Sequence, residues 1–250
     1  MSGHSKWATI KHKKASLDAK RGKMFTRIIK EITIAARQGG DPDGNPRLRT
    51  AVLAAKNVSM PADNIKKAIM RGTGELEGGQ IEEVMFEGYG PGGAAVLVNV
   101  ATDNRNRTVS DIRHCFSKNG GNMAEQGAVA WMFDRRSQIL IPGEKASEDQ
   151  LMAIVLDAGA DDLRGSADDE WEVLSRPEAH DAVLKALESS GLHPTEAGIA
   201  MVPKNLVKLE GKNAAGMLRL SEALEDHDDV QSVYSNFDID EKELEALAQQ

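Results

Sequence analysis

The sequence predicts an α+β protein of three domains, in which an N-terminal helical bundle precedes two ferredoxin-like α+β domains, one inserted in the other. The chain has 250 residues, more than a single domain usually contains. Aromatic residues form only 4% of it, so its cores must be built from aliphatic side chains, which favours helix-rich or mixed packing. Helical apolar spacing in the first 72 residues then gives way to alternating strand and helix patterns.

The helical domain is expected over residues 1–76 and contains three amphipathic helices. The second helix begins with Asn45 as its cap and Pro46 at its first position, while the third begins at Pro61 and ends at Gly72. The inward-facing residues of the three helices are, in order, Phe25, Ile28, Ile29, Ile32 and Ala36; Leu48, Ala51, Val52 and Ala55; and Ile65 and Ile69. Three such helices predict a small bundle with one core.

Strand patterns begin after a linker at residues 73–80 and read β-β-α-β. These elements are expected at residues 84–89, 94–101, 108–118 and 128–133. The turn between the first two strands, residues 90–93, is Gly-Pro-Gly-Gly and suits a backbone with positive φ. A tight hairpin is therefore predicted, with Tyr89 at its end in a position to present its ring at the surface.

A second set of elements reads β-α-β-β-α-β, the order of the ferredoxin-like split unit. Its members are expected at residues 137–141, 150–158, 162–165, 170–174, 178–190 and 197–202. A helix at 214–225, a strand at 230–237 and a helical or frayed tail at 241–250 remain, and these cannot bury a core alone. They are expected to complete the first set, which makes the middle domain 81–136 plus 206–240 and the inserted acidic domain 137–205.

Charge is distributed very unevenly along the chain. The net charge of −8 combines +11 for residues 1–72 with −19 for the remainder. A cationic module on an acidic body is typical of a protein that binds a polyanion, because clustered Lys and Arg displace the counterions of nucleic acid. A solubilising charged surface is the alternative interpretation, although such a surface usually mixes both signs.

The cations of the first helix form a basic ridge opposite its apolar stripe, and a cationic arm precedes this helix. Nucleic-acid binding is predicted for residues of the arm and the ridge, together with one histidine and one aromatic residue. These residues are Lys6, Trp7, Lys11, His12, Lys13, Lys14, Lys20, Arg21, Lys23, Arg27 and Lys30. Trp7 could stack on a base, or it could instead fill the core of the bundle.

Two further arginines, Arg105 and Arg107, lie between a predicted strand and a predicted helix. Helix capping accounts for the neighbouring Asn and Thr residues but not for both arginines. Beside a helix N-terminus they could make a second phosphate contact, and the alternative is that they bind acidic groups of a neighbouring domain.

Other classes of site have little support in the sequence. His4, His12 and Cys115 do not form a metal-ligand pattern, and no nucleophile with its base or pair of carboxylates has a recognised catalytic spacing. No enzyme activity, metal, cofactor or small-molecule substrate is therefore predicted. The acidic clusters at residues 161–162, 168–170 and 225–229 are expected to be solvated loops that repel nucleic acid.

The chain is expected to act in the cytoplasm. It opens with MSGHSKW rather than with an apolar signal segment, and its single cysteine suits a reducing compartment. No apolar run approaches the roughly 18 residues of a membrane span, so no membrane partner is predicted.

Several motifs resemble those of the YebC family and together span essentially the whole chain. They are GHSKWATIKHKK at residues 3–14, DAKRGK at 18–23, NPRLR at 45–49, MP at 60–61, DNI at 63–65, EGYGPGG at 87–93, DNRNRT at 103–108 and DDVQ at 228–231. The resemblance implies a three-domain protein and a role as a probable DNA-binding transcriptional regulator. It also implies a connection with translation, since the mitochondrial translational activator of cytochrome c oxidase looks like a relative and some bacterial members are linked to ribosomes stalled on proline-rich nascent peptides.

The resulting hypothesis is a nucleic-acid-binding regulator of gene expression that acts on DNA in transcription. The alternative is a ribosome-associated translation factor that acts on ribosomal RNA or on stalled ribosomes. No helix shows a set of Asn, Gln and Arg residues directed at base edges, so contact with the phosphate backbone is expected in either case.

Overall fold

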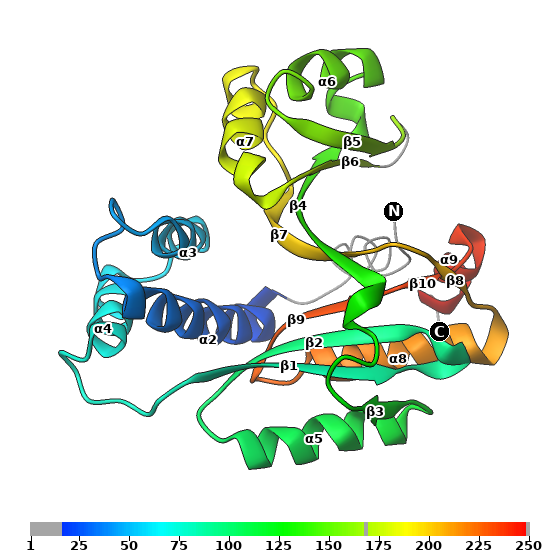
Figure 1. The fold of residues 1–250 in the computed structure, drawn as a ribbon, viewed down its shortest axis with the longest axis horizontal. Coiled ribbons are helices and arrows are strands. Elements are labelled where there is room, and N and C mark those ends of the chain that lie inside the picture. Colours follow the sequence, from blue (N-terminus) through cyan, green and yellow to red (C-terminus); the bar gives the residue numbers. More distant parts are fainter. Residues whose placement is uncertain (1–16, 168–169, 249–250) are drawn as a thin grey trace.

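The computed structural model describes residues 17–167 and 170–248 of the chain. Figure 1 shows a group of helices on one side, a sheet with two helices in the middle, and a second sheet with two helices above it. The second sheet interrupts the first along the chain, because the last strand of the first sheet follows the whole of the second. The predicted α+β fold class with an inserted domain is confirmed.

The N-terminal helices are α2 (Leu17–Ala35), α3 (Pro46–Asn57) and α4 (Ala62–Thr73), with a 3-10 turn at Ala36–Gln38 after α2. The predicted apolar stripes meet in one core, in which Ile32, Leu48 and Ala55 are completely buried. Asn45 caps α3 as predicted, since its side chain accepts a hydrogen bond of 3.1 Å from the Leu48 backbone N–H. These helices follow from local patterns, and their shared core fixes the path of α2.

The end of α4 differs from the prediction. The helix continues through Gly72 to Thr73, and Gly74 is the residue in the left-handed conformation, with φ of 84°. Gly72 serves a different purpose, because a Cβ atom there would lie 2.4 Å from the backbone oxygen of Thr33 and 2.6 Å from the Cβ of Ala36. This glycine permits the close packing of α4 on α2 rather than ending the helix.

The middle domain is a four-stranded antiparallel sheet in the order β3-β1-β2-β9. Its elements are β1 (Glu82–Tyr89), β2 (Ala95–Thr102), α5 (Arg105–Lys118), β3 (Asn122–Ala124), α8 (Gly211–Glu225) and β9 (Val230–Ser235). The turn between β1 and β2 has the predicted positive φ angles, 72° at Gly92 and 80° at Gly93. Because β9 pairs with β2, the last part of the chain completes the sheet that the middle part begins.

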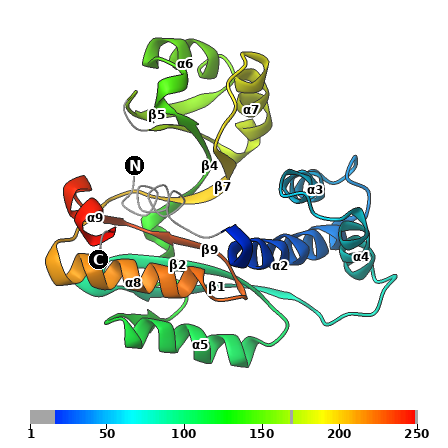
Figure 2. The same cartoon turned by 180° about the vertical axis from the view of Figure 1, so that it is seen from behind.

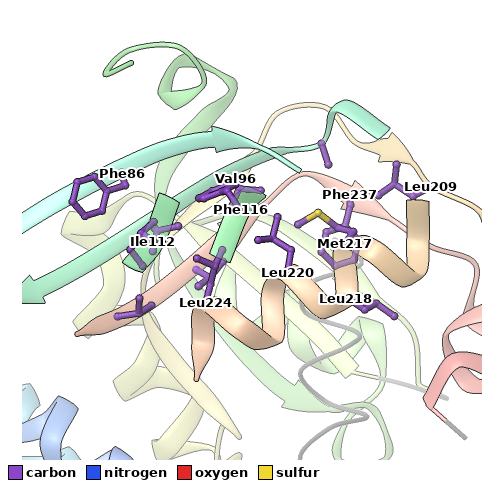
Figure 3. Close-up of a cluster of buried hydrophobic side chains, with 14 of the residues drawn as sticks. Phe86, Val96, Ile112, Phe116, Leu209, Met217, Leu218, Leu220, Leu224 and Phe237 are labelled. Atoms are coloured by element: carbon purple, nitrogen blue, oxygen red, sulfur yellow. The ribbon is translucent and has the colours of Figure 1, made fainter. Parts of the chain in front are cut away.

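Both faces of this sheet are covered. Helices α5 and α8 lie against one face, where Val96 of β2 packs in a cluster with Phe116 and Met217 (Figures 2 and 3). On the other face, Leu97 of β2 packs with Val129 from the segment before β4. Burial of both faces explains why residues 95–98 of β2 form a continuous apolar run rather than an alternating pattern.

The strand predicted at residues 128–133 is not formed. Ala130–Met132 is a 3-10 turn, and the short strand β3 takes the sheet edge beside β1. The reason is Glu87 of β1, whose carboxylate accepts hydrogen bonds from the backbone N–H groups of Gly127, Val129 and Ala130 at 2.6, 2.7 and 2.8 Å. Backbone donors that bind this carboxylate cannot also join a strand ladder.

The inserted domain has the strand order β5-β6-β4-β7, which together with its β-α-β-β-α-β connections gives the predicted ferredoxin-like arrangement. Its elements are β4 (Phe133–Pro142), α6 (Glu148–Val155), β5 (Ala160–Gly165), β6 (Glu170–Ser175), α7 (His180–Ser189) and β7 (Glu196–Pro203). Strand β4 begins at Phe133, opposite Pro203, and so runs without a break across the domain boundary predicted after residue 136. Both domains pack helices against a four-stranded sheet, but the order of their strands differs. The two central strands of the middle domain, β1 and β2, follow each other along the chain, whereas those of the inserted domain, β4 and β6, do not.

The C-terminal segment returns to the middle domain. Strands β8 (Val207–Lys208) and β10 (Phe237–Asp238) pair in parallel, and α9 (Glu241–Ala248) follows. Phe237, Ile239 and Leu244 are completely buried in the middle core. The segment predicted as a helical or frayed tail is therefore a docked helix as far as residue 248.

Candidate nucleic-acid interface

The cationic face of α2 is turned toward the middle domain. Helix α2 reaches the end of α8 and the loop that joins α8 to β9 (Figure 1). Lys23 donates to the backbone oxygen of Asp226 at 3.0 Å, Lys30 donates to that of Asp228 at 3.0 Å, and Arg27 donates to that of Glu225. The last carbonyl groups of a helix have no partner within the helix and carry partial negative charge, so Arg27 and Lys23 complete the C-terminus of α8, while Lys30 binds the loop that follows it.

Asp229 is the centre of this contact between the two domains. It is only 4% exposed, and its carboxylate lies 2.7 Å from Lys30 Nζ, 2.6 Å from Thr108 Oγ1 and 2.9 Å from an Arg107 nitrogen. Burial opposes ionisation of this carboxylate, but the hydrogen bonds from Lys30, Thr108 and Arg107 outweigh burial and hold its pKa well below the usual value. The prediction that residues 225–229 form a solvated loop is therefore wrong for Asp229.

Part of the predicted basic ridge is consequently not open to solvent. The Lys30 side chain is 16% exposed, and burial of Arg27 lowers its pKa although Glu225, Asp226 and Asp228 favour its charged form. Lys23 is more accessible, but it forms an ion pair of 3.1 Å with Asp226. The helical spacing correctly placed these cations on one face, and the structure shows that an acidic segment of the chain itself occupies that face.

A cavity of about 880 Å³ lies beside this contact, between α2, the linker after α4, the start of α5 and the α8–β9 loop. The charged residues that line it are the cations Lys30, Arg71 and Arg107 and the acids Glu77, Asp103, Asp111, Asp226, Asp228 and Asp229. Because carboxylates outnumber cations two to one, the cavity disfavours a phosphate group.

The two arginines at the start of α5 have different environments. Asn104 caps α5 by accepting a hydrogen bond from the Arg107 backbone N–H, and the Arg107 side chain pairs with Asp103 at 3.0 Å and with Asp229 at 2.9 Å. Arg107 thus binds acidic groups, as the alternative predicted, but both belong to its own middle domain rather than to a neighbouring one. Arg105 is exposed at the first position of α5 and forms no ion pair with another described residue.

The remaining predicted residues can be placed only in part. Lys6, Trp7, Lys11, His12, Lys13 and Lys14 lie outside the described residues, while Lys20 and Arg21 lie in the N-terminal part of α2, where only the backbone is described. Their assignment to nucleic-acid binding stays a prediction.

Other exposed cations on the molecule were not predicted as site residues. Those that form no ion pair with another described residue include Lys56 of α3, Lys66 and Lys67 of α4, Arg113 and Lys118 of α5, and Lys212 and Arg219 of α8. The last four lie on the α5–α8 layer, which covers one face of the middle sheet (Figure 2). Sequence reasoning missed this layer because the middle domain as a whole is acidic, and only the fold gathers its cations on the two neighbouring helices.

Neither a cluster of metal ligands nor a membrane-spanning helix is found in the described part of the chain. No group of three or more His, Cys, Asp and Glu side chains is arranged to hold a metal ion among residues 17–167 and 170–248, and His4 and His12 lie outside these ranges. None of the helices in the same ranges is long and apolar enough to cross a membrane.

Comparison with known families divides the chain at the same linker as the structure. Residues 5–75 match the model of the TACO1/YebC protein N-terminal domain, and residues 81–237 match that of the TACO1/YebC second and third domain. The two matches leave unmatched only the linker between them and the ends of the chain.

Individual relatives align over nearly their whole length. A protein of Solibacter usitatus is 83% identical over 249 residues, which cover 100% of both chains, and one of Koribacter versatilis is 63% identical over 248 residues, which cover 99% of this chain and 100% of the relative. Both are named probable transcriptional regulatory proteins. A solved structure of a conserved hypothetical protein from Aquifex aeolicus is 43% identical and superposes with a TM-score of 0.83, covering 91% of this chain and 94% of that one. The matched domains and the full-length relatives show that the chain belongs to the TACO1/YebC family.

Proposed function

We propose that this chain is a nucleic-acid-binding regulator of gene expression, without catalytic activity, that acts in the cytoplasm on DNA in transcription. The observation that carries the proposal is the charge of +11 on residues 1–72 against −19 on the remainder. The names of the relatives, probable transcriptional regulatory proteins, support the same role.

The structure refines which cations could contact phosphate. Lys23, Arg27 and Lys30 are already bound to the α8–β9 segment, whereas the lysines Lys56 of α3 and Lys66 and Lys67 of α4 are exposed. The cations of residues 6–14 lie outside the described residues and stay part of the proposal. Acidic side chains line the cavity between the domains and repel a polyanion there. Binding is therefore expected on the outer surface of the helical domain, by contacts with the backbone of the nucleic acid.

The experiment that tests this proposal measures binding of duplex DNA at several salt concentrations. The triple variant Lys11→Glu, Lys13→Glu and Lys14→Glu should weaken binding and reduce the negative salt slope by about 0.9 for each phosphate that the variant no longer neutralises. The matched control, Lys145→Glu with Lys185→Glu in the inserted domain, should leave both unchanged. Variants of Lys23, Arg27 and Lys30 are unsuitable here, because they would also release the contact between domains.

A second candidate function is a translation factor bound to ribosomal RNA. It is favoured by the scatter of the exposed cations over several helices, which suits the backbone of a structured RNA better than the major groove of a duplex. Crosslinking followed by sequencing of nucleic acid recovered from cells separates the two functions. Recovery of promoter DNA with the unaltered protein but not with the triple variant supports transcription, the same pattern for ribosomal RNA supports translation, and enrichment of neither contradicts nucleic-acid binding altogether.

A further inference from the structure

Trp131 is the most exposed large apolar side chain of the described residues, at 64%. It lies on the 3-10 turn Ala130–Met132, at the start of the crossing from the middle domain to the inserted domain. From the sequence, Tyr89 is the aromatic residue that could present its ring at the surface. Tyr89 is instead half-buried in the cluster beneath the turn, and its hydroxyl donates to the backbone oxygen of Ala128 at 3.2 Å.

The turn that carries Trp131 is held from several sides. The buried carboxylate of Glu87 binds the backbone N–H groups of residues 127, 129 and 130, and Val129 is completely buried. Burial opposes ionisation of Glu87, but these three hydrogen bonds outweigh it and lower its pKa, so the carboxylate stays charged. From the end of β7, Lys204 donates to the backbone oxygen of Trp131 through its Nζ at 3.0 Å and to that of Met132 through its backbone N–H at 2.9 Å.

The indole of Trp131 offers its faces rather than its polar edge. Its Nε1 already donates to the backbone oxygen of Ala128 at 3.0 Å, so the ring needs no further acceptor. A ring that is exposed, hydrogen-bonded at its edge and carried by a fixed backbone loses little conformational freedom when a flat group stacks on it. A planar partner can therefore stack on the face of this ring.

The surroundings of Trp131 favour a partner that is both planar and anionic. The Lys204 side chain is half exposed and forms an ion pair with Asp134 at 3.2 Å. Arg135 follows Trp131 by four positions in the chain, and it is exposed with no ion pair to another described residue. The neighbours Ala130 and Met132 are partly buried, so the indole of Trp131 is the exposed apolar group of this turn. An unpaired nucleotide combines a flat base with a phosphate and fits both features.

We propose that Trp131 is a stacking platform for an unpaired base of the nucleic acid, with Lys204 and Arg135 beside its phosphates. The inference rests on the proposed nucleic-acid-binding function and deepens it. It adds a contact with single-stranded segments, made by a residue that lies far from the N-terminal arm along the sequence. Stacking on an aromatic ring tolerates every base, so this contact adds affinity without sequence preference.

The test compares three probes: a single-stranded oligouridine, an abasic oligomer of the same length and charge, and a duplex RNA. Trp131→Ala should lower affinity for oligouridine by about 5- to 150-fold and leave the other two probes unchanged, because only oligouridine offers unpaired bases. Trp131→Phe should retain more affinity for oligouridine than Trp131→Leu, which keeps apolar surface but cannot stack. Leu156→Ala, which removes an exposed apolar side chain at the end of α6, is the matched control.

Each result decides between stacking and another role. Wild-type affinity of Trp131→Ala for oligouridine overturns the inference and leaves the proposed function intact. Absence of oligouridine binding by the unaltered protein also overturns the inference, whereas the proposed function fails only if the unaltered protein does not bind duplex DNA. Equal weakening on all three probes, or full retention by Trp131→Leu, contradicts stacking and indicates a backbone contact or an apolar protein contact. Thermal unfolding of each variant shows whether it is folded. If Trp131→Ala is not folded, the comparison of Trp131→Phe with Trp131→Leu still tests stacking.

Discussion

The buried carboxylate of Asp229 is central to the contact between the helical domain and the middle domain. It binds Lys30 from α2 and both Arg107 and Thr108 from α5, so two elements depend on one side chain. A buried charge is tolerated only when it is paired and hydrogen-bonded, and removal of one member of such a group leaves the others unpaired.

Asp229→Asn is expected to lower the free energy of unfolding by about 3 kcal/mol, because Lys30 would lose its charged partner in a buried setting. Urea unfolding followed by circular dichroism measures this difference. Asp228→Asn is the matched control, since Lys30 binds the backbone oxygen of Asp228 and this substitution leaves that atom in place. An equal decrease in both variants would show that the acidity of the loop as a whole, rather than the buried carboxylate, is what matters.

Stability should also depend on pH through Asp229. Its pKa in the folded protein lies below the value of about 3.9 in the unfolded chain, so its contribution is complete above about pH 4 and is lost as the pH falls toward the folded-state pKa. The difference in unfolding free energy between the wild type and Asp229→Asn should therefore be constant near neutrality and shrink below about pH 4. Unfolding curves recorded across this range test the sign, and a difference that grows in acid would contradict it.

At the scale of elements, packing distances explain features that periodicity does not. Helices α2 and α4 approach closely at Gly72, and loop 125–130 leaves the sheet edge because Glu87 binds its backbone. In both cases a residue of one element determines the conformation of another that is distant in sequence.

Gly72→Ala is expected to destabilise the helical domain by about 1 to 3 kcal/mol, since the added methyl group would overlap the Thr33 backbone oxygen and α4 would have to move away from α2. Gly22→Ala in α2 is the matched control, because no atom lies within 4 Å of a Cβ there and alanine favours the helix by about 1 kcal/mol. Thermal unfolding should show shifts of opposite sign. Stabilisation by both substitutions would mean that helix propensity outweighs the contact.

At the scale of the whole molecule, the charge asymmetry holds domains together as well as suiting a polyanionic partner. The cations of α2 bind the C-terminal end of α8 and the acidic loop after it, so the acidic body is in part the counterpart of the basic domain. The exposed Lys23–Asp226 pair should be screened by salt, whereas the Lys30–Asp229 pair should be screened much less.

The triple variant Lys23→Glu, Arg27→Glu and Lys30→Glu is expected to release the helical domain from the middle domain and to increase the radius of gyration in small-angle scattering. Like charges would then face each other across the contact. The variant Lys56→Glu, Lys66→Glu and Lys67→Glu changes the net charge equally, but these residues form no ion pair with another described residue, so its radius should not change. An unchanged radius in both variants would show that contacts other than those of Lys23, Arg27 and Lys30 position α2, among them the ion pairs of Arg47 with Glu31 and Glu83.

The sequence by itself determined the features that depend on neighbours along the chain. The stripes of α2, α3 and α4, the cap at Asn45, the turn at Gly92–Gly93 and the ferredoxin-like order of the inserted domain all follow from local spacing, turn chemistry and element order. The same spacing placed Lys23, Arg27 and Lys30 on one face, but it could not show what that face meets.

Only the tertiary structure decided which of these groups are already satisfied. Three features depend on residues that lie more than 30 positions apart in the sequence and meet only in the folded chain. They are the burial of Asp229, the hydrogen bonds from the backbone of residues 127–130 to Glu87, and the exposure of Trp131. The physical reason is that a charged or aromatic side chain has the same local pattern whether solvent or another part of the chain provides its partner. The fold determines whether solvent or the chain is the partner, because a polar group that is buried must form its hydrogen bonds within the protein.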